Sequence, residues 1–417
     1  MRILKLSPQT EASLQKNRKG QDLAAHRAAA RIVADVQHRG DAALDAWSRK
    51  LDGIDTSGNR LWVTQQEIAD AKKRVSRDFL RAVEHAAANV RRVAEKQLPR
   101  AWSLQVEPGI NVAQLIRPIG SIGCYIPGGR FALFSTMVMT VVPAQVVGVK
   151  RIVVVCPRAN HELLATAGLL GVTRLARIGG AQAIAALAYG TRRIAPVDKI
   201  FGPGNRYVTA AKQIISSACA IDLPAGPTEA VVLARSGNPR WIASDMLAQA
   251  EHAPDAGSYL VTTSSRLAKQ VQQEVAAQLE ALPSTNPARI SAEKIGAILL
   301  ARSWSDAIAF VNRFAPEHLS LPESSPALLK KIHASGTIFV GHLSAQPFGD
   351  YSSGSNHVLP TGGWARRRGG LSASDFVKQI SVQSVSSAGY RRLARDVQIL
   401  ACAEGLLAHA NAVEVRK

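Results

Sequence analysis

The stretch RIVVVCPRANHELLATAGLLGVTRLARIGGAQAIAALAYG, residues 151–190, alternates between two kinds of pattern. A short β-branched run, RIVVVCP, is typical of a buried strand, and the longer apolar segment HELLATAGLLGV is typical of a helix. The same order returns in RLARIGG with AQAIAALAYG, and again in KIFGPGN with RYVTAAKQIISSA. Because strands and helices alternate, this part of the chain predicts a parallel sheet covered by helices.

A second alternating block runs from about residue 228 to 345. Its strand-like runs are AVVLA, SYLVTTS and GTIFVG, and amphipathic segments such as PRWIASDMLAQAEH separate them. The first ~100 residues and the last ~40 space their apolar residues as helices do. We therefore predict an α/β protein with two parallel-sheet domains plus helical N-terminal and C-terminal segments. The cleft between two such domains is a common place for a small-molecule site.

Composition limits the class of protein. The chain has 417 residues, of which 47% are hydrophobic and 20% charged, as in globular proteins. No apolar run reaches the ~18 residues that a membrane span needs, and the N-terminus has no apolar signal core. We expect a soluble, cytoplasmic protein without a membrane partner. Its four cysteines form no CxxC pair, which argues against a disulfide framework or a zinc–thiolate site.

The net charge of +20 is the one feature that suggests nucleic acid. The basic residues are scattered along the chain, however, and aromatic residues make up only 5%, too few for a platform that stacks bases. We interpret the charge as a solvated basic surface and expect no dedicated nucleic-acid site.

Polar residues that can carry chemistry occur in groups near the ends of elements. Singly, each has an ordinary structural explanation, such as a helix cap or a turn. Together, two histidines, an aspartate and a glutamine offer nitrogen and oxygen ligands without thiolates, which suits zinc or manganese. The remaining glutamate–histidine pair suits acid–base work. The groups are Gln249 with His252, Glu317 with His318, Asp350 with His357, and Glu404 with His409.

Eight motifs, in this order, resemble the histidinol dehydrogenase family: GCYIPGGR, GGAQAIAAL, DKIFGPGNRYV, IDLPAGPTE, AEHAPDA, APEHL, GDYSSGSNHVLPTGG and LSASDFVK. The resemblance covers essentially the whole chain, and its histidine-containing motifs are together highly specific. It implies oxidation of L-histidinol to L-histidine through the aldehyde, in two NAD-dependent steps of histidine biosynthesis. It also implies a homodimer with one zinc ion per subunit, for which manganese can substitute.

The resemblance also implies roles for single residues. His318 would take the alcohol proton as hydride leaves, and Glu317 would activate the water used in the second oxidation. The C-terminal tail would cross the dimer interface, so that His409 and Glu404 serve the other subunit. The implied metal ligands are Gln249, His252, Asp350 and His409. The implied substrate contacts are Thr228, Gln249, His252, His318, Asp350, Glu404 and His409.

For the cofactor, the resemblance implies NAD contacts at Tyr125, Gln182 and Asn205, and two incomplete Rossmann-like domains. Thr228 departs from the serine that many members have, but it keeps the hydroxyl. From its position in the loop, His357 can either order Asp350 or fill a turn, and we favour the ordering role. The expected boundaries are an N-terminal arm over 1–24, a substrate and metal domain over 25–120 and 228–368, an NAD-binding domain over 121–227, and a dimer-crossing tail over 369–417.

Two other functions stay open at this stage. One is a related zinc- and NAD-dependent oxidation of another small alcohol, such as a sulfonated propanediol, which would keep the metal and acid–base residues but change the substrate end. Glu404 and the tail sequence LLAHANAV favour histidinol. The other is a basic nucleic-acid-binding protein that keeps an inert dehydrogenase body.

Overall fold

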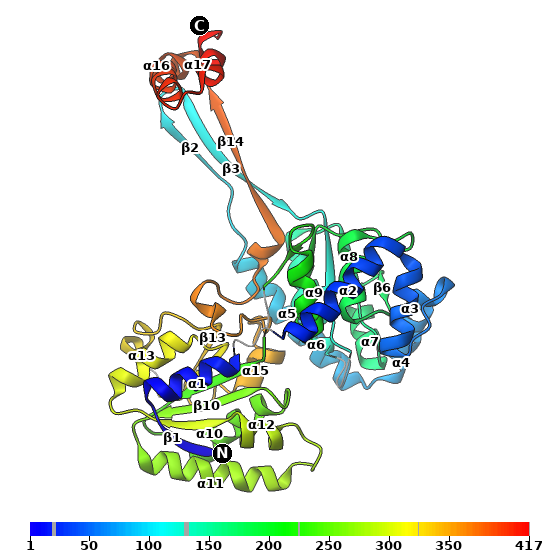
Figure 1. Ribbon diagram of the computed structural model, residues 1–417, viewed down its shortest axis with the longest axis vertical. Coiled ribbons are helices and arrows are strands. Elements are labelled where there is room, and N and C mark those ends of the chain that lie inside the picture. The colour runs from blue at the N-terminus through cyan, green and yellow to red at the C-terminus, as the bar shows by residue number, and fades with distance from the viewer. Residues whose placement is uncertain (19–21, 129–132, 224–225, 324, 417) are drawn as a thin grey trace.

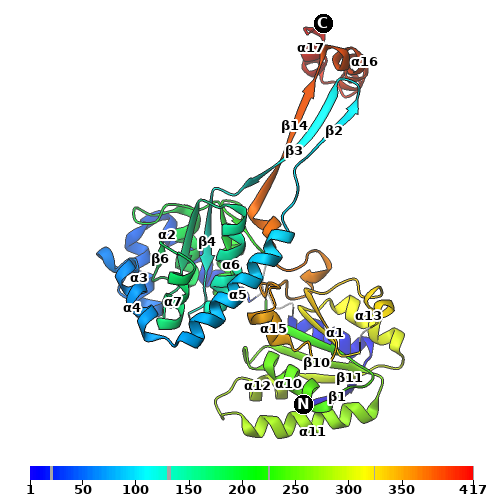
Figure 2. The same ribbon diagram turned by 180° about the vertical axis from the view of Figure 1, so that it is seen from behind.

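The computed structural model describes residues 1–18, 22–128, 133–223, 226–323 and 325–416. Two helix-covered parallel sheets form the body of the molecule, and a third, antiparallel sheet projects from it and carries the C-terminal helices (Figure 1 and Figure 2). The predicted α/β class with two parallel sheets is therefore confirmed. Among the described helices, none is both long and apolar enough to span a membrane.

The stretch that begins at residue 121 folds as a five-stranded parallel sheet in the order β6-β5-β4-β7-β8. Its central strand β4 (Ser121–Tyr125) is buried along its whole length, as expected for a sheet covered on both faces. The chain turns to opposite sides of β4 to form β5 and β7, and sheets of this kind bind ligands beside such a point, at the carboxyl ends of the strands. The other strands are β5 (Arg151–Val155), β6 (Leu175–Ala176), β7 (Lys199–Phe201) and β8 (Ala220–Ile221), and the connecting helices are α6 (Phe134–Val147), α7 (His161–Leu169), α8 (Gly180–Tyr189) and α9 (Arg206–Ile215).

Four N-terminal helices cover this same sheet. Helix α2 packs against α8 and α9, α4 against α7, and α5 against α6. We expected residues 25–120 to join residues 228–368 in one domain, and these contacts do not agree with that grouping. Apolar side chains such as Ile32 and Val83 lie instead in the cores around the five-stranded sheet. The helices are α2 (Leu23–Arg39), α3 (Asp41–Asp52), α4 (Gln65–Arg74) and α5 (Arg77–Lys96).

The second block forms a six-stranded parallel sheet in the order β1-β11-β10-β9-β12-β13. Its edge strand β1 (Arg2–Lys5) comes from the segment expected as a separate arm over 1–24. That expectation is corrected, because β1 pairs with β11 and Leu14 of α1 (Pro8–Arg18) lies in the core of this sheet. The other strands are β9 (Glu229–Leu233), β10 (Gly257–Thr262), β11 (Ala297–Leu300), β12 (His318–Leu321) and β13 (Thr337–Val340). The helices are α10 (Pro239–Ala250), α11 (Ser265–Ala281), α12 (Ala288–Lys294), α13 (Trp304–Phe314), α14 (Pro326–Leu329) and α15 (Gln346–Tyr351).

The third sheet is antiparallel, in the order β14-β3-β2, and forms a long projection that we call the arm (Figure 1). The tail over 369–417 was expected to be helical, but it begins with β14 (Val377–Val385), which pairs along its whole length with β3 (Ile110–Pro118). The third strand is β2 (Trp102–Glu107). Helices α16 (Ser387–Ala403) and α17 (Leu407–Glu414) lie at the tip of the arm, far from both parallel sheets in the two views (Figure 2).

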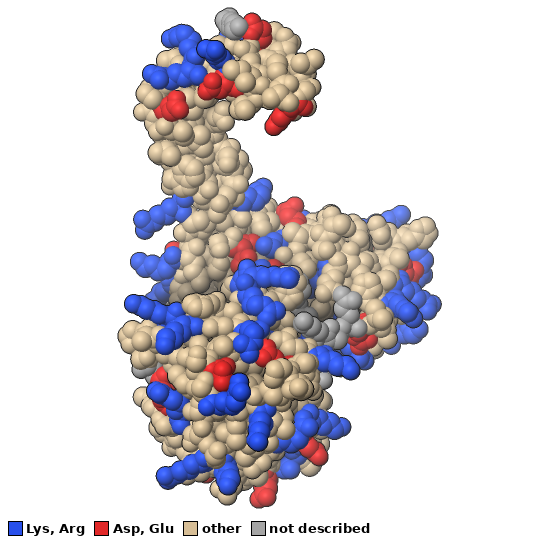
Figure 3. Space-filling view, turned by 60° about the vertical axis from the view of Figure 1, so that its left-hand side comes forward, with Lys and Arg blue, Asp and Glu red and all other residues tan. Residues whose placement is uncertain are grey.

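Three short 3-10 helices complete the described elements: η1 (Gly58–Leu61), η2 (Trp364–Arg366) and η3 (Ala373–Phe376). Lys and Arg side chains are scattered over the face seen in Figure 3, with Asp and Glu among them.

Candidate functional site

Five of the predicted site residues come together at the amino edge of the six-stranded sheet. Thr228 precedes β9, while Glu317 and His318 lie at the start of the neighbouring strand β12. Gln249 is near the end of α10, and Asp350 is in α15; both helices return from the opposite edge of the sheet. Strand starts and helix ends thus meet here. The carbonyl end of a helix favours positive charge, so this edge suits a cationic ligand.

The Glu317 carboxylate accepts hydrogen bonds from the Thr228 hydroxyl and from the Glu229 backbone, and Gln249 holds the Thr228 hydroxyl in place. Oε2 accepts a hydrogen bond from the Thr228 hydroxyl at 2.5 Å and from the Glu229 backbone N–H at 2.9 Å. Gln249 in turn donates to the Thr228 hydroxyl oxygen at 2.7 Å. A single chain of hydrogen bonds therefore joins α10, β9 and the start of β12. Thr228 provides the hydroxyl that this chain needs.

His318 lies between two carboxylates. Its Nδ1 is 3.8 Å from Glu317 Oε2 and 3.4 Å from the backbone carbonyl oxygen of Glu229, and its Nε2 is 3.6 Å from Asp350 Oδ1. The side chain is buried, and among the described residues its Nε2 has no hydrogen-bond partner. A buried nitrogen without a partner carries a desolvation cost, which a bound ligand can remove.

The charges of this group shift one another's pKa values. Burial lowers the pKa of His318, but the carboxylates of Glu317 and Asp350 outweigh it, so that the pKa is raised overall. For Asp350, burial raises the pKa, but His318 beside it, with help from His357 and His252, brings the pKa below its ordinary value. Both shifts have the sign that a carboxylate–imidazolium pair produces.

Gln249 and His252 are positioned differently from each other. Gln249 is fully buried, and its Oε1 accepts a hydrogen bond from the buried side chain of Gln346 at 2.5 Å. His252 is exposed just past the helix end, and its Nδ1 lies 3.0 Å from the backbone oxygen of Ala248. The His252 ring still influences Asp350 electrostatically. The predicted pairing of this amide and imidazole in one site stays a prediction, supported by the effect of His252 on Asp350.

His357 orders the loop that carries Asp350. Its Nδ1 lies 2.7 Å from the backbone oxygen of Asp350, and its Nε2 lies 3.1 Å from the Thr136 hydroxyl near the start of α6. Asn356 donates to the Met139 carbonyl in the same helix. The expected ordering role of His357 is supported by these contacts. They also bring the amino edge of the six-stranded sheet to the carboxyl edge of the five-stranded one.

The three predicted NAD contacts lie at that carboxyl edge. Tyr125 ends β4, and its hydroxyl oxygen accepts from the Gly180 N–H at 3.2 Å, at the start of α8. Gln182, in the first turn of α8, is buried and donates to Asp52 Oδ2 at 2.9 Å. Asn205 caps α9 by accepting from the N–H groups of residues 207 and 208. Helix N-termini favour anions such as phosphate.

Gly202 lets the loop before α9 lie against β4. It has a φ of 111°, and an added Cβ would be 2.1 Å from the carbonyl oxygen of Tyr125. A side chain here would push the loop and the Asn205 cap away from the strand. The motif FGPGN is thus required for close approach of backbone to backbone.

Glu404 and His409 are not near the other predicted residues. Glu404 follows α16 and His409 lies in α17, both exposed at the tip of the arm (Figure 1). Within the described residues, no group of three or more His, Cys, Asp and Glu is arranged to hold a metal ion. In one chain, hydrogen bonds and ion pairs link Gln249 through Thr228, Glu317 and His318 to Asp350, and His252 lowers the pKa of Asp350, whereas His409 lies apart in α17.

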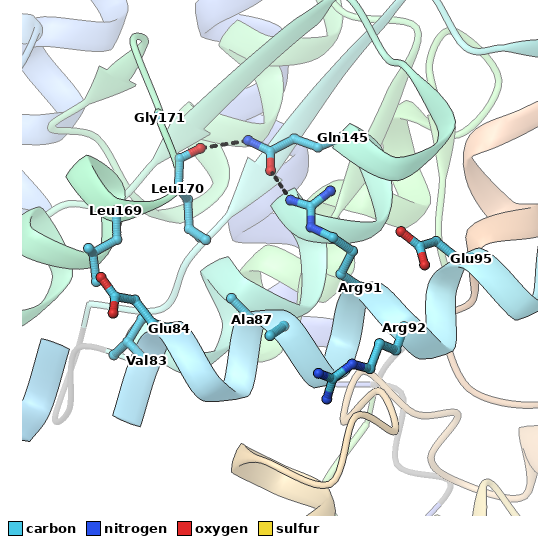
Figure 4. A pocket seen from close by; sticks show the side chains of 11 residues that line it. Val83, Glu84, Ala87, Arg91, Arg92, Glu95, Gln145, Leu169, Leu170 and Gly171 are labelled. Carbon is cyan, nitrogen blue, oxygen red and sulfur yellow. Dashed lines mark hydrogen bonds between the residues drawn. The ribbon is translucent and has the colours of Figure 1, made fainter. Parts of the chain in front are cut away.

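A groove of about 550 Å³ lies elsewhere, between α5, α6 and the end of α7 (Figure 4). Arg91 donates to Gln145, which donates to the carbonyl of Leu170, and these contacts close its upper side. None of the predicted site residues lines it.

Four residues of the site were missed by sequence reasoning. Gln346 and Asp245 flank Gln249, Asp52 holds Gln182, and Glu229 contacts both Glu317 and His318 through its backbone. Only Glu229 had a signal, because it belongs to the motif IDLPAGPTE beside Thr228.

The chain is similar to known proteins over almost its whole length. The family model described as "Histidinol dehydrogenase" matches residues 15–417. The histidinol dehydrogenase of Methanothermobacter thermautotrophicus is 43% identical over 392 residues, 92% of each chain. That of Geobacillus kaustophilus is 44% identical over 397 residues, covering 94% of this chain and 93% of the relative.

A solved structure shows the same fold. The crystal structure of histidinol dehydrogenase from Elizabethkingia anophelis superposes with a TM-score of 0.92 at 36% identity, covering 100% of this chain and 98% of the other. The sequence matches and this superposition extend over the parallel sheets, the arm and the tail. The chain belongs to the histidinol dehydrogenase family.

Proposed function

We propose that this chain oxidises L-histidinol to L-histidine through L-histidinal, in two steps that each reduce one NAD, as a cytoplasmic enzyme of histidine biosynthesis. The observation that carries the proposal is the meeting of Thr228, Gln249, Glu317, His318 and Asp350 at one sheet edge. This edge offers a base, a second carboxylate and polar ligands in a chain that belongs to the family.

His318 is the proposed base of the first step. Its unpartnered Nε2 accepts the proton of the substrate hydroxyl while the carbon gives its hydride to NAD, so that the alcohol becomes the aldehyde. Asp350 and Glu317 on either side stabilise the imidazolium that results.

Glu317 is the proposed base of the second step. It takes a proton from water as the water oxygen bonds to the aldehyde carbon, which gives the hydrate as its monoanion. That anion loses a second hydride to NAD and becomes the carboxylic acid. The hydrogen bonds from Thr228 and the Glu229 N–H fix the carboxylate in place for this role.

The donor set fits a divalent metal ion. Gln249, His252 and Asp350 supply amide oxygen, imidazole and carboxylate at a helix end that favours positive charge. When bound, zinc, or manganese in its place, would attract the nitrogen atoms of the substrate and so fix the alcohol carbon. We propose His409 of a second copy as the fourth protein ligand, because this histidine is exposed in α17, apart from the other three donors.

The arm offers the surface for that second copy. Its exposed apolar side chains include Trp102 at 48%, Leu104 at 58%, Ile380 at 43% and Leu407 at 70% exposure. Apolar faces of this kind usually mark an interface. We propose a homodimer in which the arm tip of each copy brings His409 and Glu404 to the amino edge of the other, with Glu404 contacting the substrate.

NAD is proposed to bind at the carboxyl edge of the five-stranded sheet. The N-termini of α8 and α9 point to this edge, where they can stabilise the pyrophosphate. Tyr125, Gln182 and Asn205 are the proposed contacts. The loop with His357 and Asn356 joins this edge to Asp350, which would bring the nicotinamide to the alcohol carbon.

The test is the yield of NADH per L-histidinol consumed, before and after chelation and after return of zinc. We expect two NADH per histidinol, loss of turnover on chelation and recovery with zinc. A sulfonated propanediol serves as the control alcohol, and we expect no turnover with it. Turnover of the control but not of histidinol would contradict the proposed substrate.

A further inference from the structure

We infer that Arg18 is a positioning residue for the proposed catalytic pair Glu317 and His318, and that it acts through Glu229. The inference deepens the proposed function and rests on it. Arg18 belongs to α1, outside every motif that suggested the site.

Arg18 and Glu229 form a buried ion pair beneath the site. The Arg18 side chain is 5% exposed and that of Glu229 is 3% exposed. Nε of Arg18 donates to Glu229 Oε2 at 2.6 Å, and Nη2 donates to Oε1, so the pair is bidentate. Such a fork fixes both the distance and the orientation of the carboxylate.

The guanidinium is itself immobilised. Its Nη1 donates to the carbonyl oxygen of Phe314 at 2.7 Å, and its carbon lies 3.6 Å from the centre of the Phe314 ring. The end of α13 therefore holds Arg18 from two directions. The Arg18 guanidinium therefore has little freedom to move, and it holds the Glu229 carboxylate in a fixed position.

Glu229 transmits this constraint to the site through its backbone. Its N–H donates to Glu317 Oε2 at 2.9 Å, and its carbonyl oxygen lies 3.4 Å from His318 Nδ1. Glu229 thus contacts both members of the proposed catalytic pair through its backbone, while its carboxylate is fixed by the ion pair with Arg18. A shift at the start of β9 would move both groups together.

The ion pair also offsets one of two neighbouring negative charges, that of Glu229 beside Glu317. Glu229 and Glu317 are two buried carboxylates in one place; burial raises the pKa of Glu229, and the charge of Glu317 raises this pKa further. Arg18 offsets the charge of Glu229 and leaves Glu317 as the carboxylate that faces the reaction. Without Arg18, the buried charge of Glu229 would be uncompensated, which favours displacement of the strand start.

The experiment compares Arg18→Met, which removes the ion pair of α1 with Glu229 of β9, with a matched control that removes an ion pair between α1 and α13. Arg313 of α13 pairs with Glu11 of α1 at 2.8 Å, but its side chain is 56% exposed and, within the described part of the chain, it forms no ion pair with a site residue. Arg313→Met therefore loosens α1 without touching Glu229. We expect Arg18→Met to lower kcat by about tenfold or more, while KM for histidinol and for NAD changes by less than about threefold.

Separate assays with histidinol and with histidinal give the readout that a purely structural role would not move. Because Glu317 is held directly by the Glu229 N–H, we expect the aldehyde step to be slowed more than the alcohol step. Glu229→Gln keeps the shape and is the second variant, in case Arg18→Met does not fold; we expect the same unequal loss. Zinc content and the thermal midpoint are measured for each variant.

The inference is overturned if Arg18→Met, or Glu229→Gln in its place, keeps the wild-type kcat, or if Arg313→Met lowers kcat equally. It is also overturned if both steps fall by the same factor. Failure of the wild-type enzyme to oxidise histidinol would instead contradict the proposed function, so the two failures are distinguishable.

Discussion

The two parallel sheets place their candidate contacts at opposite edges, and the helix termini at these two edges favour opposite charges. The five-stranded sheet places Tyr125, Gln182 and Asn205 at its carboxyl edge, beside the N-termini of α8 and α9. The six-stranded sheet places its polar groups at its amino edge, beside the end of α10. Helix N-termini favour an anionic dinucleotide, and helix ends favour a metal ion or a protonated amine.

The two edges also differ in whether one chain supplies all of their proposed contacts. The carboxyl edge holds its three proposed contacts within one chain. The amino edge lacks Glu404 and His409, which the arm carries to the far end of the molecule (Figure 2). We infer that the cofactor edge is complete in one chain and that the metal edge needs a second copy.

The largest effect is expected from His318→Asn at the amino edge. Removing the proposed base should lower kcat by about 100-fold or more, because the buried Nε2 of His318 has no hydrogen-bond partner among the described residues and asparagine offers no basic nitrogen in its place. Steady-state kinetics with histidinol measure this. NAD binding and zinc content should stay at wild-type values, and a loss of less than about fivefold would remove His318 from the role of base.

Glu317→Gln should slow the oxidation of the aldehyde more than the oxidation of the alcohol. The amide can still accept from Thr228 and the Glu229 N–H, so that the fold of the edge is kept. It cannot take a proton from water, so we expect the aldehyde step to fall by at least about tenfold more than the alcohol step. Histidinal should accumulate, as a trapping reagent for aldehydes would detect. Equal losses in both steps would refute the assignment.

Tyr125→Phe tests the carboxyl edge of the five-stranded sheet, and it should affect NAD without affecting histidinol. The change removes a hydroxyl that contacts the start of α8 and keeps the ring. We expect KM for NAD to rise by about three- to tenfold, while KM for histidinol stays unchanged. Tyr189→Phe, at the other end of α8, is the matched control and should leave both values as they are. A change confined to the KM for histidinol would reverse the proposed assignment of the two edges.

The smallest expected effect concerns stability. Burial raises the pKa of Asp245 in α10 to about 6, above the value of about 3.9 in an unfolded chain. The folded state then holds the proton more tightly, so the free energy of unfolding should increase as the pH falls from about 6 to about 4. Asp245→Asn should stabilise the protein at pH 8 by about 1–2 kcal/mol and remove this pH dependence.

Urea unfolding at pH 5 and pH 8 checks this prediction. If the Asp245→Asn variant were less stable than the wild type at pH 8, the Asp245 carboxylate would have to be compensated by a partner in the folded state.

The alternation in residues 151–190 was enough to predict the parallel sheets, because strand and helix periods are local properties of the sequence. It was not enough to predict which sheet a helix covers. The apolar faces of α2 and α5 fit any apolar surface, and only long-range packing places them on the five-stranded sheet. Likewise, VKQISVQSV in β14 alternates as a strand does, yet its partner β3 lies more than 250 residues earlier in the chain.

In the candidate site too, local features could be predicted from the sequence and long-range contacts could not. Adjacent pairs such as Glu317 and His318 are visible in the sequence, and the family resemblance supplies their proposed roles. The link from Arg18 to Glu229 spans 211 residues and follows no local pattern. Gln346, which donates to Gln249, lies 97 residues from it in the sequence. Contacts of this kind depend on the register of the parallel sheet, so the residues that support the site are harder to predict than those that form it.

The most direct test of the central claim, that the metal edge is completed by a second copy, is to mix two inactive variants. His318→Asn lacks the base at the sheet edge, and His409→Asn lacks the ligand at the arm tip. After full exchange of subunits in equal amounts, half of the dimers are mixed and each mixed dimer holds one intact site. We therefore predict about a quarter of the wild-type activity. A mixture that stays inactive although mixed dimers are shown to form would contradict the account.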